Sequence, residues 1–192
     1  MTAMIPTGFK SFDEKTGGLE QKKSYLLIGP KESGKEELSY KLLESAASNN
    51  FSTVYVTTAR SSTDLVNDFL ARRINVSKFL GNRIMILDDF SRNISPQAVD
   101  NPYTKVLNGP VDLTGLSVML SGVNNEFIKE GNPVVNIVDS LSVLLLYNNP
   151  VTLFRFLQFI SGRAKDLNPV GIIAVIPFLS SLILCRSGCR RP

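Results

Sequence analysis

A glycine-rich segment near the N-terminus has the residue types and the spacing of a phosphate-binding loop. The residues that match its pattern, GxxxxGK, are Gly29, Pro30, Lys31, Glu32, Ser33, Gly34 and Lys35. In such a loop the backbone N–H groups surround a phosphate, the N-terminus of the next helix adds a positive dipole, and the lysine contacts the outer phosphates. The segment therefore predicts a site for the phosphates of a nucleotide such as ATP.

The residue after this loop departs from the pattern. A working loop has Ser or Thr there, whose hydroxyl binds the Mg²⁺ that bridges the β- and γ-phosphates, whereas this chain has Glu36. A carboxylate can ligate Mg²⁺, but Glu36 adds negative charge beside the phosphates, as do Glu32 and Glu37. Two interpretations stay open. Either Glu36 lines a pocket that binds ATP weakly, or the segment is only a tight strand-to-helix turn with Lys35 as an ordinary helix cation.

A second acidic position that could hold a metal ion is Asp139, which follows the apolar segment 134–138. A carboxylate at the end of a buried strand can hold Mg²⁺ directly or through water. An Asp at a strand-to-helix turn can also act only as a helix N-cap. Because Asp139 follows the phosphate loop in the order that a nucleotide site needs, we expect it to be the metal-binding residue.

Short apolar segments alternate with longer segments of helical periodicity along the chain. This alternation predicts an α/β fold of three layers, a mostly parallel sheet of about five strands flanked by helices. The predicted strands are 24–28, 53–57, 83–87, 134–138 and 171–176, and the predicted helices are 35–47, 64–73, 114–129 and 152–167. Ser62 or Thr63 is the expected N-cap of the second helix. The segment 90–113, with three prolines, is predicted as an exposed loop or crossover of the kind that forms lids or contacts partners.

The composition excludes several classes of protein. A chain of 192 residues has the length of about one domain. Its 43% hydrophobic residues and net charge of +4 fit neither a disordered chain nor a strongly cationic binding arm. With no His and two Cys it has neither a His-based catalytic triad nor the usual ligands of a structural zinc site.

Residues 1–179 are predicted as the folded domain and residues 180–192 as a poorly ordered tail that contains Cys185 and Cys189. Three Arg of the tail carry most of the basic excess, so the charge does not indicate a nucleic-acid partner. The first ten residues lack the apolar stretch of a signal peptide, which predicts a cytoplasmic location. The uncharged run 167–185 is too short and too polar to predict a membrane span.

Three segments together resemble the RecA superfamily, in particular its KaiC and RadA-type branch. The segment 7–19 resembles the "TG…LD…GGL" sequence that leads into the first core strand, and the phosphate loop follows it. The third is Val138-Asp139-Ser140-Leu141-Ser142, which is similar to the strand-end sequence "VDSLS" of that branch. The helix 154–163 and the strand after it also resemble the family, so the resemblance covers residues 5 to about 177.

The resemblance implies a RecA-like core, ATP at Lys35, Mg²⁺ near Asp139, and a ring or filament in which homo-oligomeric or paralogous RecA/KaiC-family subunits are the partners. It also implies a Glu just after the second strand that activates water. This chain has Val56-Thr57-Thr58-Ala59-Arg60 there and no such Glu. The only substitutes that the sequence suggests are Asp88 and Asp89 after the third strand, which could equally cap or solvate that strand end.

The sequence therefore predicts a catalytically degenerate RecA/KaiC-like protein with weak or no ATP and Mg²⁺ binding, which acts as a regulatory or scaffolding partner. The alternative is an active Mg²⁺-dependent ATPase of the KaiC/RadA type, linked to DNA recombination or signalling, with Glu36 and Asp139 at its metal site. No catalytic residue can be named for it. A nucleic-acid partner is not expected, because the basic residues are scattered along the chain: Arg72, Arg73, Lys78, Arg83 and Arg92.

Overall fold

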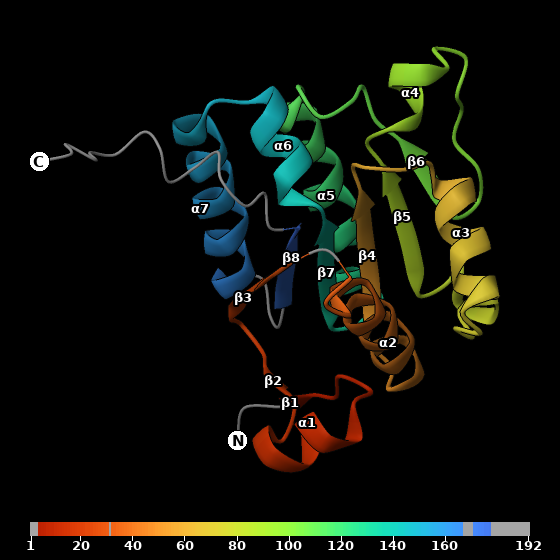
Figure 1. Ribbon diagram of the computed structural model, residues 1–192, viewed down its shortest axis with the longest axis vertical. Helices are drawn as coiled ribbons and strands as arrows, with labels where there is room; N and C mark the ends of the chain where they lie inside the picture. The colour runs from red at the N-terminus through yellow and green to blue at the C-terminus, as the bar shows by residue number, and fades with distance from the viewer. Residues whose placement is uncertain (1–3, 31, 167–170, 178–192) are drawn as a thin grey trace, which may run out of the picture.

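Six parallel strands form the central sheet of this computed structural model, which describes residues 4–30, 32–166 and 171–177 (Figure 1). In spatial order they are β3 (Ser24–Gly29), β8 (Gly171–Pro177), β7 (Val134–Asp139), β4 (Ser52–Thr57), β5 (Ile84–Asp88) and β6 (Thr104–Val106). A separate antiparallel pair joins β1 (Met4–Ile5) to β2 (Leu19–Glu20). Because the strands of the main sheet are parallel, their carboxyl ends lie along one edge, where Gly29, Asp88 and Asp139 end their strands.

Helices cover both faces of the sheet, as Figure 1 shows. On one face lie α2 (Lys35–Ser48) and α3 (Ser62–Ala71); on the other lie α5 (Leu113–Lys129), α6 (Leu141–Tyr147) and α7 (Pro150–Asp166). The remaining elements are α1 (Lys10–Thr16), the 3₁₀ turn η1 (Ser77–Phe79) and α4 (Ser91–Ile94). The three-layer α/β fold expected from the sequence is confirmed.

The central strands are buried on both faces, which is why their sequences lack polar alternation. In β4, Val54 and Val56 pack in the cluster with α5, α6 and α7, whereas Tyr55 packs in the cluster with α2 and α3. The Tyr55 ring lies edge-on to Phe69 of α3, with 5.9 Å between centroids. Phe69 in turn meets Tyr40 of α2 at 4.8 Å. This aromatic group holds α2 and α3 against the strand that leads to the candidate site.

All five predicted strands and four predicted helices are present, with ends that differ by at most two residues. The prediction for 90–113 was wrong in part, because this crossover contains α4 and β6. The three residues of β6 pair with β5 and bury Thr104 and Val106, too few to leave an alternating pattern in the sequence. The N-cap of α3 is Ser61, whose hydroxyl accepts from the Asp64 N–H, rather than Ser62 or Thr63.

The predicted domain boundary at residue 179 lies outside the described residues. The predicted tail 180–192, with its two cysteines, lies outside them as well. Among the residues that the structure does describe, no helix is long and apolar enough to cross a membrane.

Asp88 caps the carboxyl end of β5 and joins it to α3, which precedes β5, and to α4, which follows it. Its Oδ2 accepts from the Ser62 N–H at 2.6 Å and from the Ser91 hydroxyl at 2.7 Å. Its Oδ1 accepts from the N–H groups of Phe90 and Ser91 at 3.1 and 2.8 Å. These four bonds occupy both carboxylate oxygens, so Asp88 is a cap, one of the two roles that the sequence left open.

Asp89 is not a solvated strand end, since only 1% of it is exposed and neither carboxylate oxygen accepts a well-formed hydrogen bond from any described residue. Burial raises the pKa of Asp89 to about 7, and the nearby N–H of Gly109 offsets only part of that rise. The charges of Asp112 and Asp88 add to it. Asp89 is therefore a buried acid that holds its proton up to near-neutral pH.

We expect the stability of an Asp89→Asn variant to increase relative to that of wild type as the pH rises. The folded-state pKa of Asp89 lies above its unfolded value, so its contribution to stability is full below about pH 4 and is lost as the pH rises through about 7. Between pH 4.5 and pH 8 the unfolding free energy of the variant should gain on that of wild type by on the order of 3 kcal/mol.

Urea denaturation at the two pH values measures this difference. The matched control is Glu126→Gln, at an exposed position of α5, which should show the same difference from wild type at both pH values. An Asp89→Asn difference that does not change with pH would contradict the assignment of Asp89 as a buried neutral acid.

Candidate functional site

The phosphate loop has the strand–turn–helix setting that its sequence pattern requires. It leaves β3 at Gly29 and enters α2 at Lys35, with Gly34 as the N-cap residue in the left-handed region at φ +80°. A Cβ atom on Gly29 would lie 2.8 Å from the Ser33 hydroxyl, so a larger residue there would displace that hydroxyl. Lys31 lies outside the described residues. The backbone geometry is that of a loop that can surround an anion at a helix N-terminus.

The Lys35 side chain lies inside this loop. Its ammonium donates to the carbonyl oxygen of Gly29 at 2.6 Å, to the carbonyl oxygen of Pro30, and to the Ser33 hydroxyl at 3.2 Å. Only 8% of Lys35 is exposed. The loop thus holds its own lysine by two carbonyl groups and the Ser33 hydroxyl.

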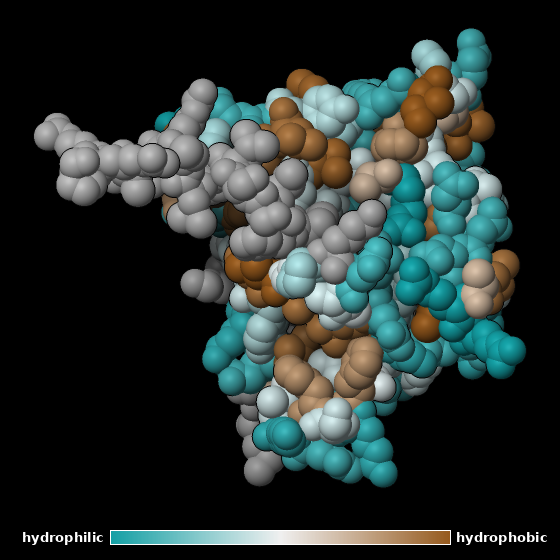
Figure 2. Space-filling view, in the orientation of Figure 1, coloured by the Kyte–Doolittle hydropathy of each residue, from teal (hydrophilic) through white to brown (hydrophobic). Residues whose placement is uncertain are grey.

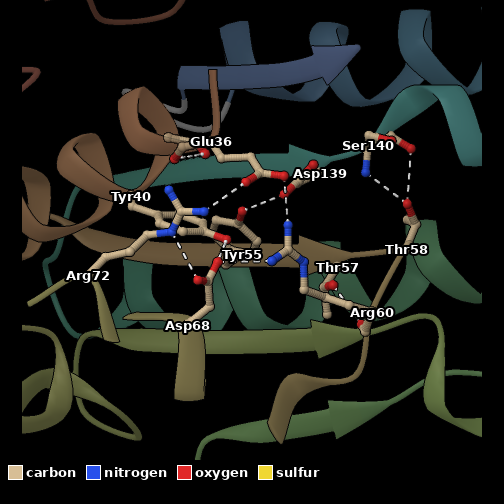
Figure 3. Close-up of polar contacts among 11 residues, drawn as sticks. Glu36, Tyr40, Tyr55, Thr57, Thr58, Arg60, Asp68, Arg72, Asp139 and Ser140 are labelled. Carbon is tan, nitrogen blue, oxygen red and sulfur yellow. Dashed lines mark hydrogen bonds and ion pairs between the residues drawn. The ribbon is translucent and has the colours of Figure 1, made fainter. Parts of the chain in front are cut away.

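Glu36 takes part in a closed ring of four ion pairs, which we call the ion-pair ring (Figure 3). Its Oε1 lies 3.0 Å from Arg60 Nη2 and its Oε2 lies 3.3 Å from Arg72 Nη2. Asp68 contacts the same two arginines, with its Oδ2 3.0 Å from Arg60 Nη1 and its Oδ1 2.9 Å from Arg72 Nε. Acid and base alternate around the ring, so its net charge is zero.

Tyr40 contacts two members of the ion-pair ring, Asp68 and Arg72. Its hydroxyl donates to Asp68 Oδ2 at 2.8 Å, and the guanidinium of Arg72 lies over its ring, 5.6 Å from the centroid. Burial alone would raise the pKa of Asp68, but hydrogen bonds from Arg72 and Tyr40 outweigh it and hold that pKa below its usual value. Asp68 is therefore ionised at neutral pH, as its ion pairs with Arg60 and Arg72 require.

Asp139 ends β7 as predicted and lies beside the ring. Its Oδ2 accepts from the fully buried Tyr55 hydroxyl at 2.8 Å. Thr58 holds the following turn, since its N–H donates to the Asp139 carbonyl and its hydroxyl accepts from the Ser140 N–H. The peptide bond between Asp139 and Ser140 is cis. Burial raises the pKa of Asp139, whereas the Tyr55 hydrogen bond and the charge of Arg60 act against that rise.

Arg60 lies in the segment after β4, where the family resemblance implies a water-activating Glu that this chain lacks. Since β4 neighbours β7, the Arg60 guanidinium lies near Asp139 while it contacts Glu36, as Figure 3 shows. The sequence analysis recorded the missing Glu but not the function of Arg60, and it assigned Arg72 to a scattered surface. The available signal was an acid in place of a hydroxyl at position 36 together with a base, Arg60, in the segment that lacks the Glu.

Asp88 and Asp89 do not join this site. Their strand, β5, is four strands from β3 in the sheet. At ~4.8 Å between neighbouring strands, their end of the sheet lies about 19 Å from the phosphate loop, which is beyond hydrogen-bonding reach of a phosphate held at Lys35. Neither acid is placed to act as the base that the sequence analysis considered.

The residues around the loop do not fit a Mg²⁺ ion in this arrangement. Mg²⁺ needs oxygen ligands in octahedral geometry. Both oxygens of Glu36 are bound to guanidinium groups, one oxygen of Asp139 is bound to Tyr55, and the charge of Arg60 acts on Asp139. Over the described ranges no group of three or more acidic, His or Cys residues could hold a metal ion. Asp139 as a metal ligand therefore stays a prediction that this geometry does not favour.

Comparison with known proteins agrees with the fold and the order of these motifs. No curated protein matches the sequence. The family model of the KaiC ATPase matches residues 5–175, a span that includes the phosphate loop, Arg60 and Asp139. With a match over most of its length and the phosphate loop and strand-end acid in their expected places, the chain belongs to the KaiC ATPase family.

Proposed function

We propose that this protein is a catalytically degenerate member of the KaiC ATPase family that binds ATP weakly and acts as a regulatory or scaffolding partner. The observation that carries the proposal is the contact between Glu36 and Arg60, with 3.0 Å between Oε1 and Nη2. It joins the position that needs a metal-binding hydroxyl to the segment after β4, which lacks the water-activating acid. The charges of Glu36 and Arg60 neutralise each other.

The expected loss of rate supports an absence of hydrolysis rather than slow hydrolysis. Removal of one group that stabilises or positions the reacting atoms typically lowers a rate by about 10²–10³. Two such groups are replaced here, and neither Asp88 nor Asp89 is close enough to compensate. The active alternative, in which Glu36 and Asp139 share a Mg²⁺, would require Glu36 to release both Arg60 and Arg72. The proposal therefore favours a protein that retains the fold of the family without its hydrolytic chemistry.

We expect no ATP hydrolysis by the purified chain. Phosphate release at millimolar ATP and Mg²⁺ should be no faster than that of a Lys35→Ala variant prepared in the same way, because the metal-binding and water-activating groups are both replaced. Turnover that remains through successive purification steps and is lost in Lys35→Ala would contradict the proposal. Asp139→Ala serves as a second control for contaminating activity.

An apolar sheet edge supports a function based on association. Within the described sheet β3 is an edge strand, and Leu26 and Ile28 on it are 55% and 59% exposed. Figure 2 shows apolar residues around a hollow in this region, and a cavity of about 150 Å³ there is lined by residues that include Phe12 and Leu19. An unpaired strand edge with apolar side chains is a ready surface for another chain. We propose subunits of this chain or of a paralogue as the partners.

We expect the chain to form oligomers through this edge. The molar mass in solution, measured by light scattering or sedimentation at tens of micromolar, should exceed the monomer value of 21.1 kDa. A Leu26→Lys, Ile28→Lys double variant should return it to the monomer, because buried ammonium groups disfavour pairing of the edge. The matched control is Val118→Lys at an exposed position of α5. A monomeric wild type would contradict self-association.

A further inference from the structure

We propose that the guanidinium of Arg60 takes the place of the metal ion in this site, so that the protein binds the triphosphate of a nucleotide without Mg²⁺. This inference rests on the proposed function and adds to it the chemical form of the ligand, which is the metal-free polyphosphate anion. The side chains present do not suit a Mg²⁺ ion, because both oxygens of Glu36 are bound to guanidinium groups.

Arg60 lies beside the two positions that would bind a metal ion. Its guanidinium is bound to Glu36, the residue that follows the phosphate-loop lysine, and its charge acts on Asp139 at the end of β7. In a phosphate-loop ATPase these are the two places that supply the metal with protein ligands. Figure 3 shows the guanidinium on one side of the neighbouring Glu36 and Asp139 carboxylates, bound to that of Glu36. A fixed cation therefore lies beside the metal-binding positions.

The charges of the site are balanced without a metal ion. The loop lysine Lys35 and the charged side chains at the metal-binding positions, Glu36, Arg60 and Asp139, sum to zero without a metal ion. A divalent cation would add positive charge beside a guanidinium that is held at 26% exposure. A free triphosphate meets the opposite situation, with two cations and the N-terminus of α2 on its side. The site thus favours the anion alone over its Mg²⁺ complex.

The ion-pair ring makes it possible for Arg60 to contact phosphate without leaving a charge unpaired. Each acid of the ring has two basic partners, so Glu36 keeps Arg72 and Asp68 keeps both Arg72 and Tyr40 when Arg60 turns away. The start of the Arg60 side chain is fixed by the Thr57 hydroxyl, which donates to the Arg60 carbonyl at 2.7 Å. A planar guanidinium suits bidentate contact with phosphate oxygens.

The experiment is a calorimetric titration of the full chain with ATP in low-salt buffer, once with EDTA and once with excess Mg²⁺. We expect binding in EDTA that is at least threefold tighter than binding in Mg²⁺. Inorganic tripolyphosphate, titrated in the same way, shows whether the phosphate chain alone is sufficient or the nucleoside contributes. Binding of ATP that requires Mg²⁺, or no binding of ATP in either buffer, would overturn the inference.

Two variants test the assignment to Arg60. Arg60→Ala should weaken ATP binding in EDTA at least tenfold, as expected for loss of one charge-assisted contact. Arg155→Ala, at an exposed position of α7, is the control and should bind as wild type does. The double variant Glu36→Ser with Arg60→Gln removes one acid and one base, keeps the Asp68–Arg72 pair, and restores the hydroxyl.

This double variant should bind ATP more tightly with Mg²⁺ than with EDTA, which reverses the order of wild type, and its thermal unfolding confirms that it is folded. If it keeps the order of wild type, Arg60 does not replace the metal and the inference fails. Phosphate release is measured in the same samples. Turnover by wild type would overturn the proposed function alone, whereas Mg²⁺-dependent binding without turnover would overturn only the assignment of Arg60.

Discussion

The contact between Glu36 and Arg60 is the interaction on which the character of this site depends. It joins the first turn of α2 to the segment after β4, two parts of the chain that are 24 residues apart in sequence. Asp68 and Arg72 of the α3 region close the ring, and Tyr40 anchors it to the aromatic group beneath. Through these contacts Glu36 and Arg60 connect α2, the segment after β4 and α3.

The two substitutions at this site make physical sense only as a pair. A carboxylate at position 36 without Arg60 would face the charges of a bound triphosphate and of Asp139. A guanidinium at position 60 without Glu36 would lose one of its two carboxylate partners in a half-buried site, which is unfavourable. Because each residue neutralises the other, the loop and the strand ends keep the geometry of the family while their electrostatics change.

Much of the architecture could be predicted because it depends on local pattern. The apolar segments of β4 and β7 are buried on both faces, and the helices between strands have clear periodicity, so their positions in the sequence are readable. The strand β6 was missed because three residues carry too little pattern. The capping of β5 by Asp88 and the burial of Asp89 could not be predicted either, since both depend on α3, α4 and the segment around Gly109.

The sequence by itself determined the class of fold, the phosphate loop, the acid at the end of β7, the departure at position 36 and the missing Glu after β4, because each is a matter of residue type and spacing along the chain. Only the tertiary structure decided that Glu36 and Arg60 are partners. Their contact depends on the order of strands, which places β4 beside β7, and on the packing of α2 and α3 over Tyr55. Long-range packing of this kind brings distant charges to 3.0 Å and leaves no local signal in the sequence.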